Sequence, residues 1–167
     1  MTALITTERL LLRPHRAEDG DAVVALLNNL DVTRWLAKVP HPFTHADLRI
    51  VNTDGSSRWP NLVAITWDGA LIGGISGGHL GYWLGQDYWG QGFGYEAARA
   101  MRDYQFDVVG VDALVSGYFE GNTASQRILT KLGFVETDRN MLFNTALDRK
   151  APNVDMELAR ATWEARQ

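Results

Sequence analysis

Residues 79–96 read HLGYWLGQDYWGQGFGYE, and this stretch decides the fold. It runs from a β-type segment through a glycine-rich connection into the start of an amphipathic helix. Gly90, Gly92 and Gly94 alternate directly before that helix. Small residues let backbone N–H groups converge, and the helix start adds unsatisfied donors and a positive dipole end. The stretch therefore predicts a pyrophosphate site. The alternative is that the glycines only allow the helix to pack closely on the sheet.

The composition of the chain fits one globular domain, which we assign to 1–167. It has 167 residues, of which 46% are hydrophobic and 22% charged. Because it has no cysteine, disulfides, thiolate zinc sites and a cysteine nucleophile are excluded. The net charge of −4 argues against a nucleic-acid partner. No signal-peptide pattern and no apolar run near the ~20 residues of a membrane helix are seen. We therefore expect a cytoplasmic protein without a membrane partner.

Hydrophobic periodicity predicts an α+β domain with a mixed sheet. The predicted elements before residue 79 are a strand at 9–14, a helix at 17–29, an apolar turn at 35–39, a helix begun by Thr44 and Asp47 and carrying Leu48, Ile50 and Val51, a loop at 54–57, and strands at 62–67 and 70–75. The last two flank Asp68-Gly69, a strong hairpin signal. After the glycine-rich connection we expect a helix with Ala97, Ala98, Met101, Tyr104 and Val108 on one face, a strand at 111–119, a helix at 124–132 ended by Gly133, and closing strands at 134–136 and 154–158.

Two nucleotide-binding patterns compete for the glycine-rich connection. A dinucleotide fingerprint needs G-x-G-x-x-G directly after a strand and an acid at the end of the next one. Here the spacing is G-x-G-x-G, and Asp112 begins its strand instead of ending it. A P-loop would need Gly-Lys-Ser or Gly-Lys-Thr, which is missing. A nicotinamide oxidoreductase therefore remains an alternative with little support.

The glycine-rich stretch resembles the GNAT superfamily of acyl-CoA-dependent N-acetyltransferases. Their pyrophosphate loop follows Gln/Arg-x-x-Gly-x-Gly/Ala, which Gly92 and Gly94 match, while Trp89 departs from the Gln/Arg position. The segments GYWL, WGQG and EA, together with NTAS at 122–125 and KLGF at 131–134, resemble the Rim-type subfamily. That subfamily includes the N-terminal acetyltransferases of ribosomal proteins. The resemblance implies a single GNAT-like domain with a mixed, mostly antiparallel twisted sheet of about six to seven strands flanked by about four helices.

The resemblance also implies how acetyl-CoA is held as co-substrate. The backbone of Tyr82, Trp83 and Leu84 would pair with the pantetheine arm like an added strand. The residues expected at the pyrophosphate are Trp89, Gly90, Gln91, Gly92, Phe93, Gly94 and Tyr95. Asn122 would bond the amide chain of the cofactor, or else cap its helix by accepting from the amide of Ala124 or Ser125.

Ser125 and Glu120 are the candidate catalytic residues. Many family members carry a Tyr proton donor where this chain has Leu129, so Ser125, one turn earlier, is the candidate donor to the leaving sulfur. The alternative for Ser125 is a first-turn serine that satisfies the backbone. Glu120 is the first candidate for the general base, with His79 and Asp87 behind it. A strand amide near Leu84 would stabilise the oxyanion.

The predicted reaction is direct attack of a primary amine on the thioester of acetyl-CoA. A protein N-terminal α-amine is favoured over a lysine because its pKa is about 8 instead of about 10.4. A small-molecule amine and a non-catalytic acyl-CoA-binding module remain alternatives. Residues 33–57 are expected to wall the acceptor side; the aromatic and histidine residues considered for this wall, some of which could equally be core, are Trp35, His41, Phe43, His45 and Trp59. No metal is implied, and the resemblance allows a homodimer.

Overall fold

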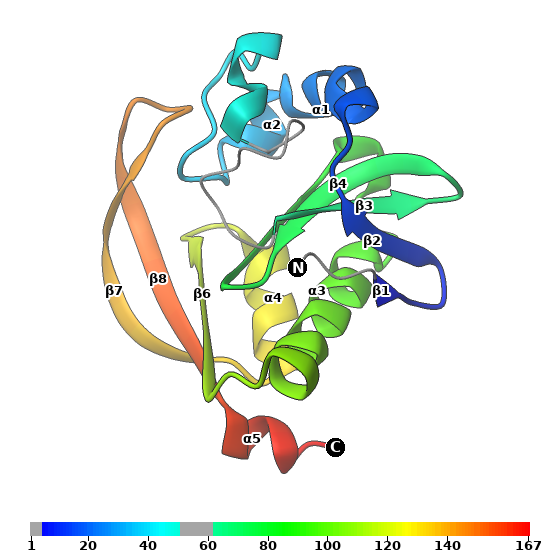
Figure 1. Ribbon diagram of the computed structural model, residues 1–167. Helices are drawn as coiled ribbons and strands as arrows, with labels where there is room; N and C mark the ends of the chain where they lie inside the picture. Colours follow the sequence, from blue (N-terminus) through cyan, green and yellow to red (C-terminus); the bar gives the residue numbers. More distant parts are fainter. Residues whose placement is uncertain (1–4, 51–61) are drawn as a thin grey trace.

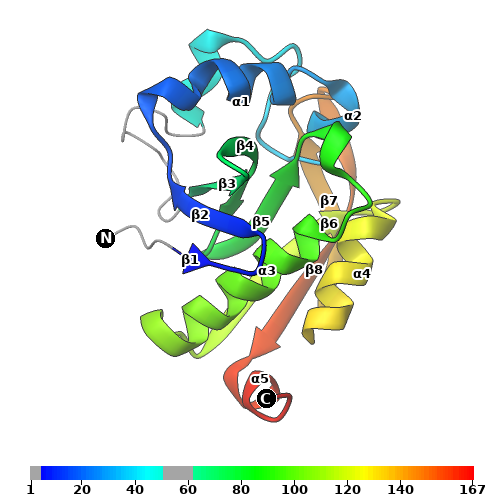
Figure 2. The same cartoon turned by 90° about the vertical axis from the view of Figure 1, so that its right-hand side faces the viewer.

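The computed structural model describes residues 5–50 and 62–167, which form one sheet with helices on both faces (Figures 1 and 2). The predicted α+β class is therefore confirmed. The strands are β1 (Ile5–Thr6), β2 (Leu10–Pro14), β3 (Val63–Trp67), β4 (Ala70–Ser76), β5 (His79–Leu84), β6 (Ala113–Phe119), β7 (Val135–Asn144) and β8 (Arg149–Ala159). The α-helices are α1 (Gly20–Leu27), α2 (Leu30–Thr33), α3 (Phe93–Tyr104), α4 (Thr123–Leu132) and α5 (Arg160–Glu164). Shorter turns are η1 (Ala17–Asp19), η2 (His45–Ile50), η3 (Gln86–Tyr88) and the π-helical η4 (Gln105–Val109).

The sheet divides into two halves between β5 and β6. Its strand order is β1-β2-β3-β4-β5-β6-β8-β7, and β5 and β6 are the one parallel pair among the described strands. These two strands pair only at His79 with Val115 and at Leu80 with Ser116. Beyond that point they separate, as the gap between the two halves in Figure 1 shows. The mostly antiparallel, mixed sheet is as predicted, and its eight strands slightly exceed the six to seven expected.

The predicted hairpin at Asp68-Gly69 joins β3 to β4. Both residues have positive φ, 49° for Asp68 and 79° for Gly69. This is the backbone of a type I′ turn, whose twist matches that of the two strands. The next turn, at Gly77 and Gly78, leads into β5, so β3, β4 and β5 form a three-strand antiparallel meander.

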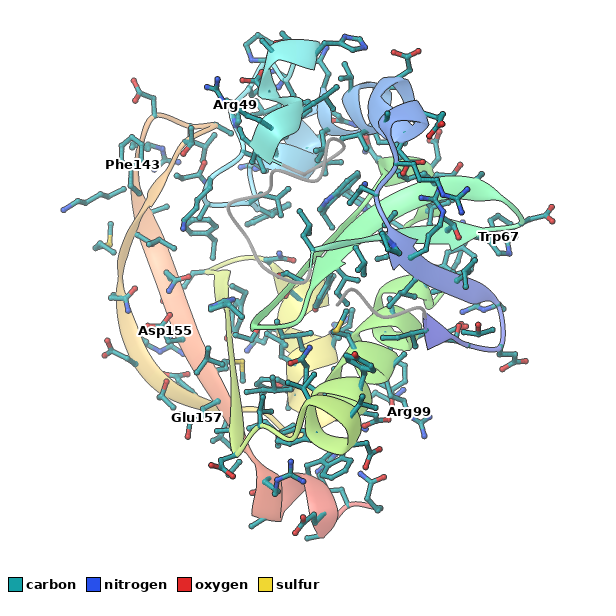
Figure 3. All side chains as sticks on the ribbon, viewed as in Figure 1. Arg49, Trp67, Arg99, Phe143, Asp155 and Glu157 are labelled. Atoms are coloured by element: carbon teal, nitrogen blue, oxygen red, sulfur yellow. The ribbon has the colours of Figure 1, made fainter. Side chains whose placement is uncertain are left out.

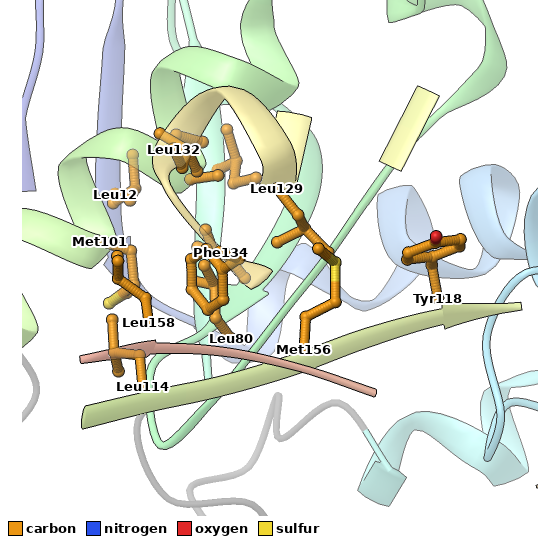
Figure 4. Close-up of a cluster of buried hydrophobic side chains, with 14 of the residues drawn as sticks. Leu12, Leu80, Met101, Leu114, Tyr118, Leu129, Leu132, Phe134, Met156 and Leu158 are labelled. Carbon is orange, nitrogen blue, oxygen red and sulfur yellow. The ribbon is translucent and has the colours of Figure 1, made fainter. Parts of the chain in front are cut away.

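Each face of the sheet has its own hydrophobic core. Helices α3 and α4 cover one face, where Leu80, Phe93 and Leu132 belong to the larger cluster of buried residues (Figure 4). Helix α1 and the segment after α2 cover the other face through a second cluster that contains Val23, Leu27, Val39, Phe43 and Trp83. Alternate residues of β5 therefore point to opposite helical layers. No helix in the described ranges is both long and apolar enough to cross a membrane.

The region after α4 differs from the expectation. The polar stretch predicted as a connection between two short closing strands is itself a long β7–β8 hairpin. Strand β7 lies at the edge of the sheet and is exposed up to Phe143, so it shows none of the apolar alternation by which strands are recognised. At the tip of the hairpin, Asn144 donates to the carbonyl oxygen of Arg34 at 2.7 Å and the amide of Thr145 to that of Ala37 at 3.0 Å.

Smaller corrections concern the helices. Val108 was expected on the buried face of its helix, yet 66% of it is exposed because the π-helical turn η4 shifts the register after Tyr104. Strand β1 and helices α2 and α5 were not predicted. The helix expected after Thr44 is the 3-10 turn η2. Val51 and the loop expected at 54–57 lie outside the described residues.

Candidate active site

A cavity of about 1360 Å³ opens where β5 and β6 separate. It is lined from both sides of the sheet: by β5, the glycine loop and the first turns of α3 and α4, and by the segment after α2, β6, β7 and β8. Among the predicted site residues, those on the lining are Tyr82, Trp83, Leu84, Trp89, Gly90, Gly92, Phe93, Gly94, Tyr95, Asn122 and Ser125. Gln91 and Glu120 are not on it.

The open edge of β5 presents free peptide groups to this cavity. Gly85 donates its amide to the carbonyl oxygen of Ile72 on β4, and Leu84 lies opposite Gly73. In an antiparallel pair this pattern turns the N–H and C=O of Leu84, and two residues earlier those of Tyr82, away from β4. These groups face the gap, and the indole of Trp89 donates to the oxygen of Leu84 at 3.0 Å. Trp89, which departs from the loop pattern of the family, thus links the glycine loop to β5.

The glycine loop ends in the start of α3, and its glycines differ in role. Gly90 and Gly92 have φ of 73° and 81°, a left-handed conformation that favours glycine. Gly94 lies inside the first turn, where an added Cβ would be 3.2 Å from Cδ1 of Ile128 on α4. The amides of Phe93, Gly94 and Tyr95 precede the first helical hydrogen bond, which Glu96 donates to Gly92. Gly94 therefore serves close packing, while Gly90 and Gly92 shape the loop.

Arg9, near the N-terminus, holds the glycine loop in place. Arg9 donates through Nε to Glu96 at 2.7 Å and through Nη1 to the carbonyl oxygen of Gln91 at 2.9 Å. Its guanidinium lies 4.4 Å from the ring centroid of Phe93. Partial burial raises the pKa of Glu96, but hydrogen bonds from Thr7 and Arg9 outweigh that effect and lower it. The carboxylate of Glu96 is thus ionised and neutralised beside the predicted anion site.

Two hydroxyl groups meet at the start of α4. Asn122 caps the helix by accepting from the amide of Ser125 at 3.2 Å, which is the simpler of its two predicted roles. The hydroxyl of Ser125 lies 3.2 Å from that of Tyr82 on β5. Burial raises the pKa of Tyr82 to about 12, against a smaller opposing effect of the hydrogen bond with Ser125. The phenol is therefore protonated and available as a donor at neutral pH.

Residues 9–135 match the model of a family described as an acetyltransferase (GNAT) domain. The chain belongs to the GNAT acetyltransferase family. The resemblance inferred from the glycine loop is thereby confirmed, and the matched range contains the loop, β5 and the start of α4. An uncharacterised N-acetyltransferase, YoaA of Bacillus subtilis, is 26% identical over 149 residues that cover 80% of this chain and 84% of YoaA.

Solved GNAT structures share the fold at low sequence identity. A GNAT-family acetyltransferase from Bacillus anthracis superposes with a TM-score of 0.81 at 22% identity, covering 95% of this chain and 99% of its own. A putative ribosomal-protein-serine acetyltransferase from Vibrio cholerae gives 0.73 at 19% identity, with 95% and 99% covered. The microcin C7 self-immunity acetyltransferase MccE, in complex with acetyl-CoA and AMP, gives 0.76 at 14% identity, with 92% and 93% covered.

The remaining GNAT positions considered for catalysis do not gather at the cavity. Leu129, in the position where relatives carry a tyrosine, is fully buried in the core under the sheet. Glu120 is exposed, and its carboxylate accepts from Nη1 of Arg139 at 3.0 Å. Asp87 is exposed and is not on the lining. Of the candidate bases only His79 lines the cavity, and partial burial lowers its pKa, so its ring is neutral at pH 7.

Part of the segment 33–57, which is expected to wall the acceptor side, lines the cavity. Trp35 lines the cavity together with Leu36 and Lys38, whereas Phe43 is buried in the second core. The two histidines, His41 and His45, are not on the lining, and His45 contacts Asp21 at 2.7 Å. Trp59 and residues 51–57 lie outside the described residues.

The side of the cavity formed by β7 and β8 is not predicted from the sequence. Asn140, Met141 and Leu142 of β7 and Asn153 and Asp155 of β8 all line the cavity. The only signal was the alternation of polar and apolar residues around Asp155, and such a pattern is equally typical of a strand with one solvated face.

Proposed function

We propose that this GNAT protein transfers the acetyl group of acetyl-CoA to a primary amine, with a protein N-terminal α-amine as the favoured acceptor. One observation carries the proposal: a single cavity joins the glycine loop, the open edge of β5 and the hydroxyl pair of Tyr82 and Ser125. Its volume of about 1360 Å³ exceeds the 300–1,000 Å³ typical of small-ligand pockets, which leaves room for a long cofactor and an acceptor.

The residues of the cavity fit an acyl-CoA. The outward N–H groups of Tyr82 and Leu84 and the outward C=O of Tyr82 suit the amides of a pantetheine arm, in the manner of an added strand. The amides of Phe93, Gly94 and Tyr95 suit a pyrophosphate at the start of α3. MccE, which shares this fold, was crystallised in complex with acetyl-CoA, and that complex supports the choice of cofactor.

Bound acetyl-CoA supplies the activated thioester, and the chain's own groups would hold and polarise it. The outward N–H groups of β5 would donate to the thioester carbonyl, where an oxyanion develops. The hydroxyl of Ser125, backed by that of Tyr82, would donate to the leaving sulfur at the positive end of α4. Glu120 remains the base proposed from sequence, although its pairing with Arg139 leaves Ser125 as the better supported catalytic residue.

The preference for an α-amine rests on acidity and on resemblance. About a tenth of an α-amine with pKa near 8 is already neutral at pH 7, whereas a lysine side chain needs a strong base. The chain carries segments that resemble the Rim-type subfamily, and one structural neighbour is a putative ribosomal-protein-serine acetyltransferase. Both observations support a protein N-terminus over a small-molecule amine.

An alternative is a non-catalytic acyl-CoA-binding module on the same fold. It is favoured by the buried Leu129, which cannot act as the tyrosine of many relatives would. It is also favoured by the ion pair of Glu120 with Arg139.

The test is release of CoA thiol from acetyl-CoA across a panel of acceptors. The panel contains peptides that differ in their first residue, the same peptides with blocked N-termini, polyamines and small amines. We expect turnover with free peptide N-termini and none with blocked ones. Binding of CoA without turnover on any amine would leave the binding module, and turnover on small amines alone would overturn the N-terminal preference.

Thermal melts with CoA and with NAD complete the test. We expect CoA to raise the melting temperature and NAD to leave it unchanged, because ligands stabilise only the state they bind. A shift with NAD and none with CoA would contradict the acetyl-CoA assignment.

A further inference from the structure

Asp155 is the one carboxylate among the described residues that line the cavity. It lies on β8, labelled in Figure 3, and alternates with Val154 and Met156, which belong to the core under α3 and α4. Its side chain therefore points to the opposite face, the side on which Trp83 packs with α1. The glycine loop and the Tyr82–Ser125 pair belong to the α3 and α4 side. Asp155 thus approaches the gap from the side away from the acyl-CoA residues.

The position of Asp155 along the sheet matches the point where β5 and β6 separate. The last paired residues there are Leu80 and Ser116, and Asp155 lies opposite Gly117, the next residue of β6. A Cβ added to Gly117 would lie 3.4 Å from Oδ1 of Asp155. Because glycine has no side chain, the carboxylate extends over β6 at the start of the gap.

Two asparagine amides fix the orientation of this carboxylate. Asn140 donates to its Oδ2 at 2.7 Å, and Asn153 donates to its Oδ1 at 2.9 Å. Asn153 also donates to the oxygen of Asn140 at 3.1 Å, which ties the three side chains together. An ionised carboxylate offers about four acceptor positions, so two amide donors leave it able to accept further hydrogen bonds.

The charges around Asp155 favour a cation. Asp138 lies opposite it on β7 and accepts from the same Asn140 amide at 3.3 Å. His79 lies on the same face, and partial burial lowers its pKa, so it adds no positive charge at pH 7. Among the described residues that line this side of the cavity, Lys38 is the one with a positively charged side chain. The neighbouring wall is apolar and comes from Trp35 and Leu142, which shares the face of Asp155.

We propose that Asp155 binds the ammonium group of the acceptor amine and determines that the acceptor is cationic. This inference rests on the proposed function, since it assigns the acceptor end of the same cavity. It concerns binding before the amine loses its proton, not the removal of that proton. The acceptor class is a primary ammonium on an apolar body, with the charge against Asp155 and the body against Trp35 and Leu142.

The test measures binding of a small probe, so it does not depend on turnover. Benzylamine is titrated into CoA-loaded protein, with uncharged benzyl alcohol as the matched probe. The side-chain amide signals of Asn140 and Asn153 in a nitrogen–proton NMR spectrum report on the site. We expect benzylamine to shift both signals and Asp155→Asn to weaken its binding at least tenfold, with Asp155→Glu recovering part of it.

Glu157→Gln is the matched control, because it removes an exposed carboxylate two residues along the same strand. It should leave benzylamine binding unchanged. If Asp155→Asn does not fold, the salt dependence of binding to the unsubstituted protein is measured instead. Added NaCl should weaken the binding of benzylamine and leave that of benzyl alcohol unchanged. The inference is overturned if benzylamine does not bind, or if it binds Asp155→Asn as tightly as the unsubstituted protein. It is also overturned if the two probes respond equally to salt. CoA affinity, measured in parallel, tests the proposed function separately, because Asp155→Asn should leave it unchanged.

Discussion

The hydroxyl groups of Tyr82 and Ser125 lie 3.2 Å apart, which joins β5 to the first turn of α4 across the gap in the sheet. Leu129 stands where the resemblance implies a tyrosine in many family members, but the phenol of Tyr82 reaches the same helix from β5. Burial raises the pKa of Tyr82 to about 12, so it remains a hydrogen-bond donor over the whole working pH range.

The first prediction concerns this hydroxyl pair. Ser125→Ala and Tyr82→Phe should each lower kcat by about tenfold to a hundredfold, since each removes a donor that acts when negative charge develops on sulfur. The double variant should be little worse than the worse single one, because the two groups act as a unit. Acetyl-CoA affinity should change by less than about threefold, because the donor acts on the sulfur mainly as negative charge develops there. Two independent, multiplicative effects on kcat would contradict the pairing.

The second prediction concerns Leu129. Its side chain is fully buried and packs in the core instead of lining the cavity. Leu129→Tyr should therefore destabilise the fold by about 1–3 kcal/mol, because a larger polar side chain must enter a close-packed site. It should not raise kcat on the best peptide. Leu132→Tyr, in the same core and also fully buried, is the matched variant for the stability loss. A gain in turnover for Leu129→Tyr would show that the family position can reach the thioester here.

The conformation of the glycine loop could be predicted from the sequence because its signals are local. The glycines at 90 and 92 indicate a backbone that other residues avoid, and the helix that follows supplies its own N–H groups. The hairpin at Asp68-Gly69 was readable for the same reason. In these cases a few neighbouring residues contain the whole physical cause.

The parts of the cavity where distant segments meet could not be predicted from the sequence, because their cause is tertiary. Tyr82 and Ser125 are 43 residues apart and meet only because β5 and β6 are neighbours. Asp155 sits in an alternating strand whose polar face is typical of a solvated surface, yet its side chain lines the cavity. The order β6-β8-β7 places β8 beside β6, and nothing local to either strand specifies that order.

The third prediction concerns the loop glycines. Gly90→Ala and Gly92→Ala should weaken CoA binding about tenfold, because alanine resists φ values of 73° and 81° and would shift the N–H groups. Gly110→Ala is the matched control, since Gly110 has a φ of 82°, open space around it and no place on the cavity lining. It should carry the same backbone strain, of about 1–2 kcal/mol, with CoA affinity unchanged. Titration of CoA by calorimetry measures all three, and equal affinities would show that the loop conformation is not needed.

The fourth prediction concerns acid stability and His15. Its ring is almost fully buried, and neither ring nitrogen has a hydrogen-bond partner among the described residues. Asp19, 3.9 Å away, is already bound by the guanidinium of Arg13 through two hydrogen bonds of 2.8 Å. Burial is the largest cause that lowers the pKa of His15 to about 4, and nearby Arg13 adds to it while Asp19 opposes it.

The sign follows from proton counting. Between the unfolded pKa of about 6.5 and the folded value of about 4, the unfolded chain binds more protons than the folded one, so stability falls as the pH is lowered through this window. The loss from His15 should reach about 3 kcal/mol. Asp19 adds a separate loss at lower pH, because its own pKa is lowered: hydrogen bonds from Arg13 and Arg16 outweigh the effect of burial.

Urea unfolding at a series of pH values from about 4.5 to about 8 measures the slope of stability against pH. His15→Leu should remove most of this slope. The slope that remains should come from His79, whose pKa is lowered by burial. The same variant should cost little at the alkaline end of the series, because the ring makes no hydrogen bond to the described residues that could be lost. An unchanged slope in His15→Leu would mean that the ring is protonated in the folded protein and that Asp19 accepts its charge.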